Sequence, residues 1–169
     1  LGYFHIVTLG FERLGISSSL SFLILVLMLI GSGINIPLTK KKPVLRREIS
    51  FFELFQPPKV ETSFIAINLG GAVIPALISF YLLYESWQKG FNLWLILAAI
   101  ILMTIISKLL AKAVPGRGII IPAFIPPIFS AIISLVLTPD YSAVTAFISG
   151  VLGTLIGADL LNLNELQNR

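Results

Sequence analysis

The residue most suited to catalysis or binding in this sequence is Asp159, the only carboxylate deep in a hydrophobic segment. It lies in the stretch from Gly150 to Asn162, near the end of the last long apolar run. A carboxylate at the centre of a membrane helix costs about 2.5 to 3.5 kcal/mol, so such a residue usually has a partner or a function. Asp159 is therefore the only candidate for a catalytic residue and the first candidate for a binding group. The alternative is a carboxylate that caps its helix at the membrane interface.

Several polar or helix-breaking residues fall at a similar depth. At 1.5 Å per residue, Asp159 lies about 27 Å beyond Tyr141, near the inner boundary, and Asn68 lies about 6 Å into its own run. Prolines in the second and fourth runs free backbone carbonyls, which need partners in a bilayer. A polar cavity open to the cytoplasm would satisfy these groups, whereas the alternative for the asparagines is hydrogen bonding between helices. The predicted binding site comprises Asp159, Asn68, Asn35, Pro75, Pro122 and Lys112.

The composition limits the chemistry further. The sequence has no cysteine, so it can form neither a disulfide nor a thiolate metal site. The only histidine, His5, cannot form a metal cluster alone. It also lies on the predicted outer side, where no arrangement of nucleophile and base is recognisable. We expect no metal and no cofactor.

The composition also indicates that the protein lies in a lipid bilayer. Of the 169 residues, 56% are hydrophobic and 12% are charged, and the mean hydropathy is +0.96. A soluble domain has far more polar surface, so the expected partner is the lipid bilayer. Most basic residues behind the net charge of +4 fall in loops between apolar runs. Membrane orientation explains this charge better than nucleic acid does, and we expect no nucleic-acid partner.

Five apolar runs predict an all-α fold, a polytopic bundle of transmembrane helices in which prolines break individual helices. Each run approaches or exceeds the roughly 20 residues that a helix needs to cross a bilayer. The predicted spans cover residues 18–37, 62–84, 91–114, 119–138 and 141–163.

The basic residues predict the orientation of these spans. If the loop from Lys40 to Arg47 is cytoplasmic, ten of the twelve Lys and Arg residues lie inside, and only Arg13 and Lys89 lie outside. We therefore expect an integral protein of the cell membrane with an external amino terminus. The expected regions are an interfacial segment at 1–19, a transmembrane bundle at 20–163 with a basic cytoplasmic loop at 38–61, and a cytoplasmic tail at 164–169.

The second and fourth runs contain similar segments. Gly71 to Ile78 aligns with Gly118 to Ile125 at an offset of 47 residues, and each copy sets glycine four residues before proline. Because both copies run from inside to outside, they predict a parallel repeat of a two-helix unit. Chance similarity between two Ile-rich segments is the alternative. The same offset places Lys112 opposite Asp159, where Lys112 could neutralise the carboxylate or extend to the cytoplasmic surface.

Three glycines in the last run predict close contact between helices. Gly153 and Gly157 form a small-x-x-x-small pair, and Gly150 precedes them. Small residues at this spacing let two helix backbones approach each other. The three glycines could pack helices within the chain or join two copies of it in a homo-oligomer.

Four segments together resemble a known family. They are Gly31 to Pro37, Asn68 to Pro75, the run that contains Pro122 and Pro126-Pro127, and Gly153 to Asn162. From about residue 20 to residue 163 the chain is similar to a prokaryotic membrane protein family of unknown function, number 1614 among the uncharacterised domain families. The resemblance implies a multi-spanning membrane protein with no assigned activity. It also implies a glycine-rich segment with Phe-Asp-Gly, and another apolar run, beyond residue 169.

Three functions fit these residues. The first is translocation of a small solute or ion through a cytoplasm-facing polar site at Asp159, flanked by proline-broken helices. The second is an intramembrane aspartyl protease, because Gly157-Ala-Asp159 and Pro75-Ala-Leu77 are similar to two motifs of presenilin-type enzymes. The order of these motifs is reversed here, and Asp140 lies about 27 Å from Asp159, too far to share a proton. The third is a non-catalytic scaffold subunit.

Overall fold

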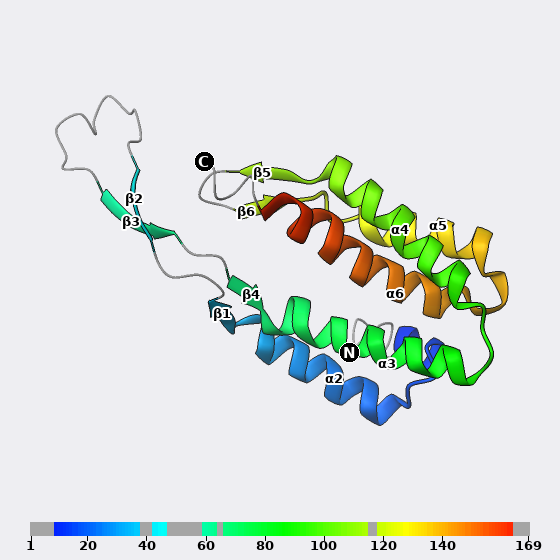
Figure 1. Cartoon of the computed structure of the whole chain (residues 1–169). Coiled ribbons are helices and arrows are strands. Elements are labelled where there is room, and N and C mark those ends of the chain that lie inside the picture. Colours follow the sequence, from blue (N-terminus) through cyan, green and yellow to red (C-terminus); the bar gives the residue numbers. More distant parts are fainter. Residues whose placement is uncertain (1–8, 38–41, 47–58, 64–65, 115–117, 164–169) are drawn as a thin grey trace.

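The computed structural model describes residues 9–37, 42–46, 59–63, 66–114 and 118–163 (Figure 1). It confirms the predicted all-α class, since five α-helices account for most of the described chain. After a helical turn at residues 9–13, the helices are α2 (Ser18–Ser32), α3 (Ile74–Gln88), α4 (Leu93–Leu110), α5 (Ile125–Leu137) and α6 (Ser142–Thr154).

Three helical segments within the described residues are long and apolar enough to cross a membrane. They are Leu69–Gln88 with 20 residues, Leu93–Leu110 with 18 and Pro139–Asn162 with 24. Each extends over most of a predicted span. The chain is therefore an integral membrane protein.

The other two apolar helices, α2 and α5, are shorter than the predicted spans. They have 15 and 13 residues. A proline disfavours helical backbone in the residue before it, and Pro37 and Pro122 each stand at the non-helical end of these two runs. Prolines are tolerated in a first helical turn, so Pro126 and Pro127 lie in the first turn of α5.

Three pairs of antiparallel strands connect the helices, although the sequence predicted none of them. Strand β1 (Asn35–Pro37) pairs with β4 (Ala66–Asn68), β2 (Lys42–Arg46) pairs with β3 (Lys59–Ser63), and β5 (Lys112–Val114) pairs with β6 (Gly118–Ile120). Figure 1 shows all three pairs at one end of the helices, which we call the strand end. The turns between α3 and α4 and between α5 and α6 lie at the other end, the turn end.

Two helices, α4 and α6, pack in parallel along most of their length. At the turn end, the rings of Phe91 and Tyr141 stack with their centroids 4.2 Å apart. Towards the strand end, Gly153 and Gly157 bring α6 against α4 so closely that a Cβ atom on Gly157 would lie 2.2 Å from the carbonyl oxygen of Thr104. Glycine is required there because any side chain would overlap backbone.

This packing assigns the glycines a role within the chain. Gly153 faces Met103 of α4, Gly157 faces Thr104 of the same helix, and Gly150 faces Ser130 of α5. Gly153 and Gly157 are thus buried by α4, while Gly150 is partly buried against α5. This contact within the chain is one of the two predicted alternatives; the other, a homo-oligomer interface, stays a prediction.

The predicted repeat matches the observed order and direction of the helices. Each unit consists of a helix with proline in its first turn, a connecting turn and a second helix; the second helices are α4 and α6. Ser107 and Thr154, which are equivalent at the offset of 47, lie side by side with their hydroxyl oxygens 3.4 Å apart. The units differ in packing, because α5 packs closely on α6 whereas α3 packs mainly on α6 and little on α4.

Both repeat prolines lie where the helical backbone is interrupted. Pro75 follows a π-helical turn, Leu69–Val73, that precedes α3. Pro122 lies in non-helical residues between β6 and α5. Because proline cannot donate an amide hydrogen and its ring clashes with the preceding turn, each residue prevents a regular α-helix from extending towards the strand end.

The surface of the bundle is that of a protein in lipid. Large apolar side chains are exposed on α2, α3, α4 and α5, among them Leu29, Leu109 and Val136. Four aromatic residues with polar groups are exposed near the turn between α3 and α4, where a bilayer interface would place them. These residues are Tyr81, Tyr84, Trp87 and Trp94.

Candidate functional site

Asn35 and Asn68, two of the predicted site residues, lie together where α2 meets the start of α3. The side-chain nitrogen of Asn68 donates to the Asn35 side-chain oxygen at 3.0 Å and to the backbone oxygen of Ser32 at 2.7 Å. Its side-chain oxygen accepts from the amide of Gly71 at 2.6 Å, so Asn68 also caps the π-helical turn. The asparagines therefore form hydrogen bonds that fix two helices to each other, which is the structural alternative given by the sequence.

Replacing Asn68 by alanine should destabilise the bundle by about 1 to 2 kcal/mol, because a helix cap and two further hydrogen bonds are lost. Asn35→Ala removes only the bond between the two side chains and should cost less. The apparent free energy of unfolding, measured by SDS titration of the purified protein, gives both values. Equal losses would show that the cap and the bond to α2 contribute nothing.

Asp159 is the last residue of a π-helical turn, Leu155–Asp159, that continues α6. Its side chain is exposed at the strand end, and among the described residues it has no hydrogen-bond or ion-pair partner. A helix C-terminus carries partial negative charge and unsatisfied carbonyl groups. An ionised carboxylate, which only accepts hydrogen bonds, cannot cap such an end. The prediction that Asp159 caps its helix is therefore wrong.

The cap is instead formed by Asn162, which the sequence analysis did not single out. Its side-chain nitrogen is buried and donates to the carbonyl oxygens of Gly157 at 3.1 Å and Ala158 at 2.9 Å. An asparagine just after an apolar helical run is a known signal for a helix end, and it could have been used. With the cap formed by Asn162, Asp159 makes no capping hydrogen bond to the described residues.

Lys112 begins strand β5, and strand β6 contacts the turn that carries Asp159. Both charged side chains are exposed, and within the described part of the chain no ion pair joins them. The structure thus brings the six predicted site residues to the strand end in two groups. Asn35, Asn68 and Pro75 surround the start of α3, while Lys112, Pro122 and Asp159 belong to the elements around the end of α6.

The second aspartate required for a protease is far from this end. Asp140 lies in the turn Pro139–Tyr141 at the turn end, and the helical segment Pro139–Asn162 separates it from Asp159. Asp140 and Asp159 are thus too far apart to share a proton. No group of three His, Cys, Asp or Glu side chains suited to a metal occurs in the described ranges.

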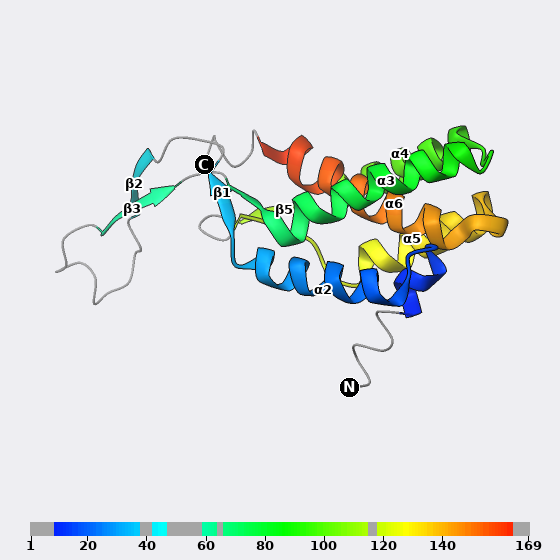
Figure 2. The ribbon, with the colours of Figure 1, turned by 90° about the horizontal axis from the view of Figure 1, so that it is seen from below.

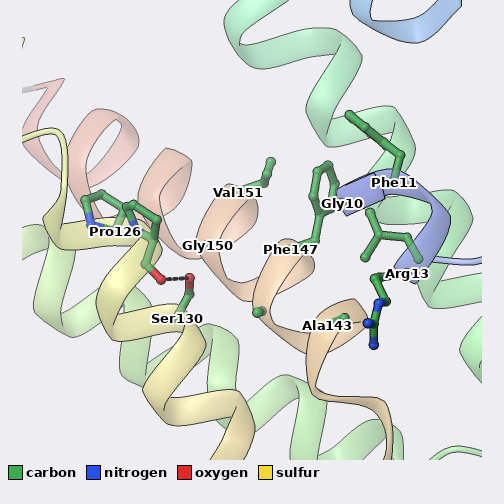
Figure 3. A pocket seen from close by; sticks show the side chains of 12 residues that line it. Gly10, Phe11, Arg13, Pro126, Ser130, Ala143, Phe147, Gly150 and Val151 are labelled. Carbon is green, nitrogen blue, oxygen red and sulfur yellow. Dashed lines mark hydrogen bonds between the residues drawn. The ribbon is translucent and has the colours of Figure 1, made fainter. Parts of the chain in front are cut away.

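A groove that the sequence did not predict lies away from these residues. It has a volume of about 650 Å³ and is open to one side, between residues 10–14, α5 and α6 (Figure 3). Figure 2 shows the helical turn at residues 9–13 beside the turn end of the bundle. The lining residues are Gly10, Phe11, Arg13, Leu14, Pro126, Pro127, Ser130, Ala143, Ala146, Phe147, Gly150 and Val151.

Fold and site together define a polytopic membrane protein made of a helix bundle with strand pairs at one end. The chain matches the family described as "Protein of unknown function (DUF1614)" over residues 29–169, and it belongs to that family. This confirms the resemblance seen in the sequence. No curated protein and no solved structure matches the chain.

Proposed function

We propose that this membrane protein translocates a small solute or an ion and that Asp159 supplies the charge of its binding site. The observation that supports the proposal is the carboxylate at the C-terminal end of a membrane-spanning helix, which has no hydrogen-bond or ion-pair partner among the described residues. The helix dipole disfavours a negative charge at this position, and Asn162 already provides the cap. A carboxylate that adjoins an apolar helix and has no partner among the described residues is suited to bind a cation or a cationic solute.

The interior of the bundle supports the same function. Buried hydroxyl groups occur on α3, α5 and α6, on the faces that these helices turn towards one another. They belong to Ser79, Ser86, Ser130, Ser134, Thr145 and Ser149. Most donate to a carbonyl of their own helix, as Ser79 does to Pro75 at 2.9 Å, and keep lone pairs free to accept. The hydroxyl oxygen of Thr145 is buried without a partner in the described chain.

Two π-helical turns also support the proposal. One precedes α3 and the other ends at Asp159, both on the strand end. Such turns are often found at functional sites because they leave carbonyl groups without their regular helical partners. In the proposal, these carbonyls and the Asp159 carboxylate meet the solute as it enters from the cytoplasm.

We expect Asp159→Asn to abolish flux and to leave folding intact, since the amide has nearly the same size and only the charge is lost. The purified protein is reconstituted in liposomes, and proton and Na⁺ entry are followed with internal fluorescent indicators after a gradient is imposed. Asp140→Asn is the matched control, because this aspartate is also exposed but lies at the turn end. Its flux should equal that of the wild type.

Flux in Asp159→Asn equal to that of the wild type would contradict the role of the carboxylate. Wild-type liposomes that admit neither ion faster than protein-free liposomes would contradict ion translocation and favour the scaffold function. The protease alternative predicts cleavage of a membrane-embedded peptide that Asp159→Asn eliminates. The protease alternative has no support among the described residues, because Asp159 is not close to a second aspartate there.

A further inference from the structure

The groove at the turn end is lined mainly by apolar residues. One face of α6 forms its floor, with the small residues Ala143, Ala146 and Gly150 at helical spacing beside Phe147. Pro126 and Pro127 of α5 form one wall, and Phe11 and Leu14 form the other. Because the residues of the floor are small and those of the walls are large, the groove is deepest along α6. Its volume of about 650 Å³ is typical of a ligand site.

The walls offer little to a polar ligand. Ser130, the hydroxyl residue of the lining, donates to the carbonyl oxygen of Pro127 at 3.2 Å, as the dashed line in Figure 3 shows. The other side chains of the lining, apart from Arg13, are apolar. Because the groove opens on the flank of a membrane bundle, the surrounding medium is lipid, and an acyl chain is the apolar ligand that the medium supplies.

Arg13 adds a charge at the edge of this apolar groove. Its side chain is exposed and has no hydrogen bond or ion pair to any residue that the structure describes. The charged residues nearby have other partners. Glu12 accepts a hydrogen bond from Ser18, and Lys89 forms an ion pair with Glu85 at 2.8 Å. Among the described residues Arg13 thus has no partner for its guanidinium, the group that binds phosphate oxygens with two parallel hydrogen bonds.

We propose that the groove binds an anionic phospholipid, with one acyl chain along α6 and the headgroup phosphate on Arg13. The apolar groove is complementary to the acyl chain of such a lipid, and the Arg13 guanidinium at its edge is complementary to the headgroup phosphate. Lys89 lies at the same end of the bundle, because a Cβ atom on Gly15 would come 3.8 Å from its amino group. This site is independent of Asp159, which lies at the strand end.

Native mass spectrometry tests the proposal with protein purified from mixed vesicles of phosphatidylglycerol and phosphatidylcholine. The wild type should retain phosphatidylglycerol in preference to phosphatidylcholine. Arg13→Gln should lose this preference, and Arg13→Lys should keep part of it. Lys89→Gln, which removes an ion-paired cation at the same end, should retain the lipid as the wild type does.

A second variant tests the apolar part. Ala143 lines the groove but is exposed, so Ala143→Phe can fill the groove without disturbing the core, and we expect it to lose both lipids. Glycerol phosphate, which has the headgroup but no acyl chain, should not displace the bound lipid. Unchanged preference in Arg13→Gln, unchanged retention in Ala143→Phe, or displacement by glycerol phosphate would each overturn the proposal.

Discussion

Replacing Gly70 by alanine is expected to cause the largest loss of stability of any single-methyl change in this protein. Gly70 lies in the π-helical turn that crosses α2. A Cβ atom there would lie 2.0 Å from the carbonyl oxygen of Met28, 2.4 Å from the amide nitrogen of Ser32 and 2.7 Å from the carbonyl carbon of Gly31. All three atoms belong to the backbone of one helix, so no side chain can rotate to make room.

The overlap can be relieved only if α2 and α3 separate. Overpacking of a well-packed site typically costs about 1 to 3 kcal/mol, and we expect Gly70→Ala to reach at least the upper value. Separation would also break the hydrogen bond from Asn68 to Ser32. The apparent free energy of unfolding in an SDS titration measures the loss, and the yield of folded protein provides a second readout.

Gly33→Ala is the matched control for this prediction. It lies at the end of α2, close to the crossing, and has a helical φ of −79°. A Cβ atom there would meet nothing nearer than the carbonyl oxygen of Ile30 at 3.6 Å, an ordinary contact. We expect little change in stability. A Gly70→Ala protein as stable as Gly33→Ala would contradict the close crossing of α2 and the turn before α3.

Hydropathy was sufficient to predict the all-α class and where the helices lie, although α2 and α5 are shorter than the predicted spans. Long apolar runs have few alternatives to helices in a bilayer, because every backbone group must be satisfied within the segment. The breaks at Pro75 and Pro122 were predictable for a related reason, since proline removes a donor wherever it occurs. Parallel α4 and α6 likewise followed from the direction of the repeat.

The strand pairs and the groove could not be predicted in this way. Asn35 pairs with Asn68 across a long connection, and no local pattern in a three-residue strand indicates such a partner. The groove depends on where residues 10–14 meet α6, a contact between segments more than 120 residues apart in sequence. For Asp159, burial in an apolar run suggested a cap or a partner, and only the packing of Asn162 showed that the cap lies elsewhere.

We propose that α4 and the segment Pro139–Asn162 cross the membrane with Lys112 and Asp159 at the cytoplasmic face. The sequence contains no cysteine, so single cysteines report their own positions. Gln88, Lys112 and Asp140 are exposed and stand beyond or near the ends of these segments. Each is replaced by cysteine in turn.

Labelling of intact cells with a membrane-impermeant maleimide is the direct test. Cysteines at positions 88 and 140 should react in intact cells, and the cysteine at position 112 should react only after the membrane is permeabilised. The reverse pattern would keep the bundle but overturn its orientation. Equal labelling of all three positions in intact cells would place both ends of α4 on one side of the membrane and contradict the account.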